Sequence, residues 1–437
     1  LLPYNTARVR PERHERETMS TTKFGEFHSG IGRRQFCEKM GMLVGAAALP
    51  SSLSLLSGCG EDPTLPPAAP NLDIPFDPTI PWWLQGNFAP VTNELLSENL
   101  EVKGSIPSEL NGLYVRNGSN PLSGESSHWF FGDGMLHGVR FENGKALWYR
   151  NKFIETGLLG IDGSGVPPTG GNNASNVSAI YHGNKLLTSG EIGLPFEIDP
   201  NDLSTRGLHT FAQDVKNSFT AHPKIDPTTG HMHFFGYWVM PPYLTYYVAD
   251  AQGNVLESHE IPVNKPTMVH SFAITEQDIV FWECPVIFSM EAVGRGDPNP
   301  FEWQPEYGAR IGVMPIGGTP DQLRWVEIEP CYVFHEVNAY RDGDDIIVDV
   351  CRHKDMFTDE RLSASGESNR LTRWKINTAG ENLTFSEEIL AEKQLELPTH
   401  DRRYSGKNYK HGWMVQTRSH PHTVDFAGIG HVNFQTG

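Results

Sequence analysis

The chain has 437 residues, of which 38% are hydrophobic, and its formal net charge is −18. This length allows a large core, and a single all-β domain can extend beyond about 250 residues. The acidic balance includes no basic stripe that could neutralise phosphates, which argues against a nucleic-acid surface.

The first 58 residues have the features of an export signal. The twin-arginine pair Arg33-Arg34 precedes an apolar run of about 17 residues, short for a membrane span and typical of a signal segment. The run ends at Leu56-Ser57-Gly58-Cys59, which resembles a lipobox. We therefore expect residues 1–58 to be removed and the mature protein to be periplasmic, anchored to a membrane by lipid on Cys59. The alternative is a buried helix with an incidental arginine pair.

The next segment, residues 59–81, is rich in proline and is expected to form an extended tether. Downstream, the remaining cysteines Cys284, Cys331 and Cys351 show no C-x-x-C spacing and are odd in number. They allow at most one disulfide and no cysteine metal site, so core thiols are expected.

From residue 111 onward, short β-rich runs alternate with turn signals. Residues 138–141 and 146–149 flank Glu142-Asn143-Gly144, which predicts a hairpin with a type I′ turn. Further strands are predicted at 231–238, 243–249 and 346–351, and no convincing amphipathic helix longer than about three turns separates them. This spacing predicts a sandwich, barrel or propeller, and the length favours an all-β propeller.

Three histidines share a similar local setting at the start of strand-like runs. His222 lies in Ala-His-Pro-Lys, His270 in Val-His-Ser-Phe, and His335 in Phe-His-Glu-Val. Imidazoles delivered singly from separate blades could converge on a metal, since no local motif such as HExxH is present. From the residues alone, however, each is more often an ordinary hydrogen-bonded histidine.

Two histidine pairs offer an alternative. His231 and His233 lie two apart on a predicted strand, so their side chains share a face and could chelate. His420 and His422 have the same spacing, with a proline between them. Neither pair has a third ligand candidate nearby in the sequence, so neither is favoured as a metal site.

Two long motifs make a metal site at His222, His270 and His335 the favoured interpretation. Residues 111–121 read NGLYVRNGSNP, and residues 128–139 read HWFFGDGMLHGV. Both resemble the corresponding segments of the carotenoid cleavage oxygenase family, which includes lignostilbene dioxygenases and a retinoid isomerase. The settings of the three histidines match the first three iron ligands of that family, in order and in flanking residues. The resemblance extends from about residue 82 to the end of the chain.

The resemblance implies a seven-bladed β-propeller over residues 82–437, with Fe(2+) on its axis held by four histidines. His222, His270 and His335 would be three of the ligands. By their position in the family pattern, Glu191 and Glu396 resemble two of the three glutamates that orient the histidine rings. Without the resemblance, both would be read as solvated surface acids.

The implied reaction is the cleavage of a conjugated carbon–carbon double bond of a carotenoid or apocarotenoid by dioxygen, giving two carbonyl products. No protein acid–base pair is needed, and aromatic runs such as Phe234-Phe235 and Phe281-Trp282 could line a tunnel for the apolar polyene. One alternative is a lignostilbene-type stilbene dioxygenase, although a lysine of those enzymes is replaced here by Glu155. Another is a metal-free propeller that only binds ligands. No protein partner is predicted.

The end of the chain departs from the family pattern. The fourth histidine of the family lies near its C-terminus between a Phe and a Gly, and no late histidine here has that setting. We therefore expect the last blade or two to be missing, and the chain as given to be inactive.

Overall fold

The computed structural model describes residues 77–98, 100–160, 173–216, 218–297, 299–358, 369–420 and 423–436. The twin-arginine pair, the lipobox with Cys59 and most of the predicted tether at residues 59–81 lie outside these ranges.

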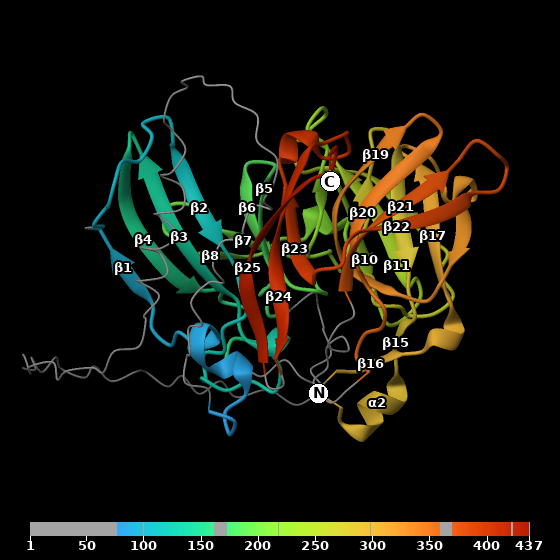
Figure 1. Cartoon of the computed structure of the whole chain (residues 1–437). Coiled ribbons are helices and arrows are strands. Elements are labelled where there is room, and N and C mark those ends of the chain that lie inside the picture. Colours follow the sequence, from blue (N-terminus) through green and yellow to red (C-terminus); the bar gives the residue numbers. More distant parts are fainter. Residues whose placement is uncertain are drawn as a thin grey trace, which may run out of the picture. The chain divides into compact units, whose positions relative to one another are not determined.

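The described residues form six antiparallel sheets of three or four strands that follow one another along the chain, and one two-stranded ribbon (Figure 1). The first contains β1 (Leu95–Ser97), β2 (Gly112–Arg116), β3 (Met135–Glu142) and β4 (Lys145–Phe153), in the order β1-β4-β3-β2. The second contains β5 (Ser178–His182), β6 (Lys185–Ser189), β7 (Phe196–Ile198) and β8 (Thr205–Leu208). The third contains β9 (Lys224–Ile225), β10 (Met232–Tyr237), β11 (Leu244–Ala249) and β12 (Val255–Glu260).

The later sheets follow the same plan, with neighbouring strands in chain order. The fourth contains β13 (Ala273–Ile274), β14 (Asp278–Glu283), β17 (Ala309–Pro315) and β18 (Arg324–Ile328). The fifth contains β19 (Tyr332–Asp342), β20 (Asp345–His353), β21 (Asn369–Asn377) and β22 (Thr384–Ala391). The sixth has three strands, β23 (Leu395–His400), β24 (His411–His420) and β25 (Thr423–Asn433).

The edge strands show how the sheets are arranged. At one edge β2 contacts β5, β13 contacts β19 and β19 contacts β23, and at the other edge β18 contacts β22. Antiparallel sheets that repeat in this way are the blades of a β-propeller, which confirms the predicted all-β class.

The blade count differs from the expected seven, because the described residues form six blades. That expectation came from the family resemblance, since strand spacing does not count blades; a typical blade uses about 40–45 residues. The fourth blade uses more chain than that, since an inserted ribbon of β15 (Val286–Phe288) and β16 (Phe301–Trp303) separates β14 from β17.

The strands predicted from turn signals are present. β3 and β4 form the expected hairpin, in which Asn143 and Gly144 have φ of 48° and 75°, as a type I′ turn requires. The runs at 231–238, 243–249 and 346–351 correspond to β10, β11 and β20.

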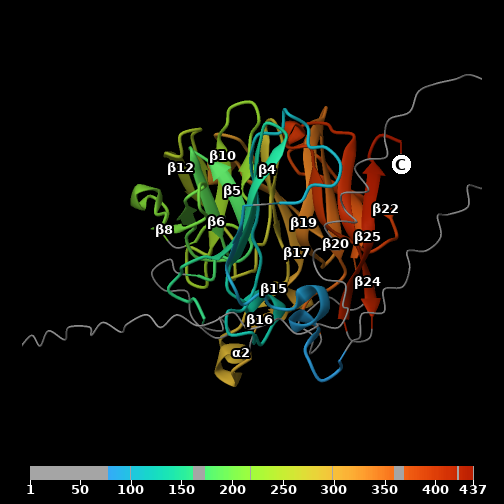
Figure 2. The ribbon, with the colours of Figure 1, turned by 90° about the vertical axis from the view of Figure 1, so that its left-hand side faces the viewer.

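Helical structure is sparse. The helix α2 (Met290–Arg295) lies within the inserted ribbon, where Ser289 caps its start and Gly296, at φ 78°, ends it. Figures 1 and 2 both show α2 and the ribbon on the same side of the sheets. Single 3₁₀ turns occupy Trp82–Leu84, Gly86–Phe88, Trp129–Phe131, Phe211–Gln213, Pro305–Tyr307, Pro320–Gln322 and Arg402–Tyr404. Among the described residues, no helix is long and apolar enough to cross a membrane.

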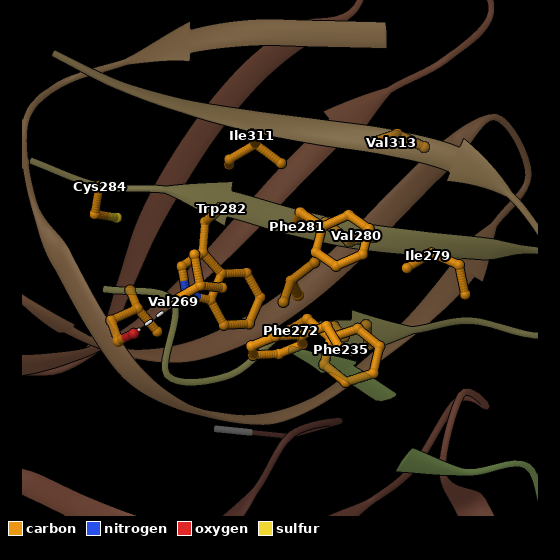
Figure 3. Packing of buried hydrophobic residues seen from close by; sticks show 14 of the residues in the cluster. Phe235, Val269, Phe272, Ile279, Val280, Phe281, Trp282, Cys284, Ile311 and Val313 are labelled. Carbon is orange, nitrogen blue, oxygen red and sulfur yellow. Dashed lines mark hydrogen bonds between the residues drawn. The ribbon is translucent and has the colours of Figure 1, made fainter. Parts of the chain in front are cut away.

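The main core fills the space between the third, fourth and fifth blades (Figure 3). Phe272 stacks on Phe281 with ring centroids 5.7 Å apart, and Phe235 meets Phe272 edge-on at 5.3 Å. Trp282 donates to the carbonyl oxygen of Val333 in the next blade. These aromatic residues are buried and pack between blades. The predicted core thiols, Cys284, Cys331 and Cys351, are buried and free.

Candidate metal centre

Each of the three histidines singled out in the sequence lies on or just before the strand that opens a blade. His222 comes two residues before β9, and His270 three residues before β13. His335 lies inside β19, where the pairing with β20 is interrupted between Val333 and Glu336. A bulge of this kind frees a residue from the ladder and re-aims its side chain.

The structure brings the three imidazoles together. The Nε2 atoms of His222 and His270 are 2.8 Å apart, and those of His270 and His335 are 3.3 Å apart. One ligand atom from each residue lies within 4.8 Å of the other two, and no other cluster among the described residues meets this criterion.

Two of the three rings are oriented by the carboxylates that the resemblance pointed to. Nδ1 of His270 lies 2.6 Å from Oε2 of Glu191, and Nδ1 of His335 lies 2.7 Å from Oε2 of Glu396. A carboxylate at Nδ1 keeps the proton on that atom and leaves the Nε2 lone pair free.

Both carboxylates are themselves held in place. Tyr237 donates its hydroxyl to Glu191 at 2.8 Å, and His353 lies 2.6 Å from the second oxygen of Glu396. Burial alone would raise the pKa of Glu396, but its interactions with the imidazoles of His335 and His353 outweigh burial and hold that pKa well below its usual range. Glu396 is therefore an anion beside the cluster.

The third ring is kept in its neutral form. Burial, followed by the neighbouring histidines and the charge of Lys224, holds the pKa of His222 well below its ordinary value. A neutral imidazole is the form that ligates metals.

This donor set fits a divalent metal ion. Nδ1 of each of His270 and His335 lies beside a glutamate oxygen, and neutral rings with the proton on Nδ1 would present two lone pairs to each other across the 3.3 Å between their Nε2 atoms. Such a contact is repulsive unless a cation lies between the two nitrogens. The spacing is close to the roughly 3 Å expected for two nitrogens at right angles on a metal with bonds of about 2.1 Å.

The alternative histidine pairs do not form a comparable cluster. His233 is buried, with Nδ1 2.6 Å from the hydroxyl of Tyr246, and the backbone N–H of His231 donates to Thr229. His422 and the side chain of His420 lie outside the described part of the chain.

Four residues at this centre had no predicted role. His353 supports Glu396 from 43 residues away, and Lys224, Ser271 and Glu336 contact one another beside the three histidines. The last three directly follow the ligand candidates or come two residues later, which is a signal available in the sequence. No local pattern points to His353.

Glu155, which argued against a stilbene substrate, is exposed. It follows β4, and its backbone N–H donates to Oγ1 of Thr205 at 2.9 Å.

Comparison with known proteins identifies the family of this chain. The family model described as retinal pigment epithelial membrane protein matches residues 88–437. The chain is 32% identical over 380 residues to carotenoid 9,10(9′,10′)-cleavage dioxygenase 1 of Phaseolus vulgaris, covering 77% of this chain and 69% of that protein. It is 34% identical over 351 residues to a carotenoid cleavage oxygenase of Mycobacterium tuberculosis, covering 68% of this chain and 70% of that protein. The chain belongs to the carotenoid cleavage oxygenase family.

Other relatives in this family have different names. Isoeugenol monooxygenase of Pseudomonas putida is 31% identical over 369 residues, covering 76% of this chain and 75% of that protein. The solved lignostilbene dioxygenase of Pseudomonas brassicacearum superposes with a TM-score of 0.70 at 27% identity, covering 77% and 76% of the two chains. A Synechocystis apocarotenoid oxygenase variant superposes with a TM-score of 0.68 at 22% identity, covering 82% of this chain and 84% of that chain. This similarity supports the β-propeller fold. These family members are named as oxygenases, and the chain is likewise an oxygenase.

Proposed function

We propose that the protein binds one Fe(II) through His222, His270 and His335 and uses dioxygen to cleave a conjugated carbon–carbon double bond into two carbonyl products. The observation that carries this proposal is the convergence of the Nε2 atoms of His222, His270 and His335, with a glutamate oxygen beside Nδ1 of two of the rings. Both atoms of dioxygen enter the products, so the reaction needs no external reductant.

The residues have separate tasks in this proposal. The three neutral imidazoles hold the ion, and Glu191 and Glu396 fix two of the rings. When bound, Fe(II) supplies the activation of dioxygen, which no side chain provides. The protein holds the double bond near the ion and keeps water away.

For the full-length protein we propose a seventh blade and a fourth histidine ligand, as the family resemblance implies. Four neutral imidazoles would add no charge to the ion and would leave room at it for dioxygen.

For the substrate we propose an apolar polyene, a carotenoid or apocarotenoid. The names of the Phaseolus and Mycobacterium relatives support this class. The family resemblance supports it as well, since Glu155 stands where the lignostilbene-type enzymes carry a lysine. The second candidate is a phenolic substrate, which the names of the similar isoeugenol and lignostilbene enzymes support.

The test is a measurement of metal content and products on the full-length protein. After anaerobic loading with Fe(II), we expect one iron per chain, and carbonyl products from at least one member of a panel of carotenoids and apocarotenals. If the protein turned over a hydroxystilbene faster than every polyene tested, its substrate would belong to the phenolic class. Absence of bound iron would contradict the metal centre itself.

A further inference from the structure

The residues that follow the three histidines in sequence contact one another. Nζ of Lys224 donates to Oγ of Ser271 at 3.1 Å and also to Oε1 of Glu336. Oγ of Ser271 donates in turn to Oε2 of Glu336 at 2.7 Å. The result is a closed triangle of hydrogen bonds, which we call the inter-blade lock.

Each corner of the inter-blade lock comes from a different blade. Lys224 begins β9 of the third blade, Ser271 leads into β13 of the fourth, and Glu336 lies in β19 of the fifth. The lock is largely shielded from water, because the side chains of Lys224 and Glu336 are 19% and 8% exposed and Ser271 is 1% exposed.

The strands themselves fix these segments weakly. β9 and β13 are two residues long, and each pairs with only one neighbouring strand of its blade. β19 is longer but is interrupted at the site. Among the described residues, the ladder bonds of β9, β13 and β19 stay within their own blades. Thr220 donates to the carbonyl oxygen of His270 and Tyr332 to that of Met268, so these bonds each link two of the segments, whereas the lock links all three.

We propose that Lys224, Ser271 and Glu336 are positioning residues that hold the three histidines converged before metal binds. This inference rests on the proposed metal centre. Ligand bonds of about 2.1 Å tolerate little error, so a histidine segment that drifts between blades weakens the site. Partners that orient metal ligands typically contribute 10–100-fold in metal affinity.

Charge offers a competing explanation, and the two can be separated. If the lock acted only through its charges, removal of the Lys224 cation would leave an extra anion near the site and tighten metal binding. Removal of the Glu336 anion would weaken it, and removal of both would restore the affinity of the unmodified protein. Positioning instead predicts weaker binding in all three cases.

The experiment measures the Co(II) dissociation constant of the full-length protein by competition with a chelator, and records the visible Co(II) absorption spectrum. We expect Lys224→Met, Glu336→Gln and the double variant each to bind Co(II) about 10–100-fold more weakly than the unmodified protein. We also expect a changed spectrum, since the ligand geometry loosens.

The matched control is Arg310→Met. Arg310 pairs with Glu283 at 2.6 Å, and the two side chains are 20% and 2% exposed, much like the pair in the lock. This variant should lose thermal stability but keep the Co(II) affinity and spectrum. An equal loss of affinity in Arg310→Met would overturn positioning by the lock.

The remaining outcomes separate the two proposals. Unchanged or tighter Co(II) binding by Lys224→Met, with normal binding by the unmodified protein, would overturn the lock and leave the metal centre intact. Failure of the unmodified protein to bind Co(II) or Fe(II) would overturn the metal centre, and the lock with it.

Discussion

A buried histidine in this protein takes its role from what its two ring nitrogens contact. In His270 and His335 a carboxylate occupies Nδ1, so Nε2 faces the cluster as a lone pair. In His233 the hydroxyl of Tyr246 lies at Nδ1. Among the described residues, His233 is not part of a group of three or more side chains that could hold a metal ion. The same residue type therefore belongs to the candidate metal centre in one case and to blade packing in the other.

The buried His233 should make stability depend on pH. Burial lowers its pKa to about 4, whereas an unfolded chain has a histidine pKa near 6.5. Because the folded pKa is the lower one, the unfolded chain binds more protons between these values, so stability falls as pH falls through this window. The full effect of this one residue is about 3 kcal/mol.

We therefore expect His233→Gln to show a smaller fall in melting temperature between pH 6.5 and 4.5 than the unmodified protein, even if it melts lower at pH 7. Thermal scans at one fixed rate measure this. His231→Gln replaces a partly exposed histidine two residues away and should keep the original pH dependence. Parallel pH profiles for His233→Gln and the unmodified protein would contradict the assignment.

At the scale of single elements, the sequence indicated the strands better than their irregularities. The Asn143-Gly144 turn and the β10 and β11 runs were readable, because turn chemistry and β-branched or aromatic residues act locally. The bulge in β19 was not readable, because it is defined by pairing with β20. That bulge frees His335 from the ladder.

Another feature hidden from the sequence is the close approach of β10 to the segment that carries His222. A Cβ atom added to Gly236 would lie 2.2 Å from the carbonyl oxygen of Ser218. Two residues further, the N–H of Thr220 donates to the carbonyl oxygen of Phe235 at 2.7 Å. A glycine is therefore required here by space, although its φ is not positive.

We expect Gly236→Ala to destabilise the protein by about 1–3 kcal/mol, because the backbone must move apart. The movement should also displace His222 and weaken Co(II) binding. Melting temperature and Co(II) affinity, measured on the same samples, test both effects. The matched control is Gly294→Ala in α2, where an added Cβ meets nothing within 4 Å and the helix gains up to about 1 kcal/mol. Normal melting of Gly236→Ala would refute the close-approach argument.

At the scale of the whole molecule, the metal centre depends on segments far apart in the chain. Lys224 and Glu336 are 112 residues apart, and His335 and Glu396 are 61 apart. Spacing and periodicity report only on near neighbours, so the residues alone left each histidine as an ordinary core or surface residue. The family resemblance supplied the three histidines and both glutamates. It gave no role to His353 or to the inter-blade lock. The lock residues follow the histidines in sequence, but their contacts with one another exist only in the folded propeller.

The cellular location of the whole protein rests on residues outside the described ranges. Arg33-Arg34 lies upstream of Leu56-Ser57-Gly58-Cys59, and this combination predicts export by the twin-arginine route with lipid attached to Cys59. That route carries folded proteins, which suits an enzyme that loads its metal before export. A single acyl chain binds membranes only marginally, so stable anchoring requires more than one chain on that cysteine.

We expect Cys59→Ala to move the full-length protein from the membrane fraction to the soluble periplasmic fraction, because the lipid attachment point is lost. Replacing both Arg33 and Arg34 with Lys should keep the protein in the cytoplasm. Cys37→Ala changes a cysteine inside the signal and should leave membrane attachment intact. Fractionation followed by immunoblotting measures all three. Retention of Cys59→Ala in carbonate-washed membranes would show that something other than Cys59 holds the protein there.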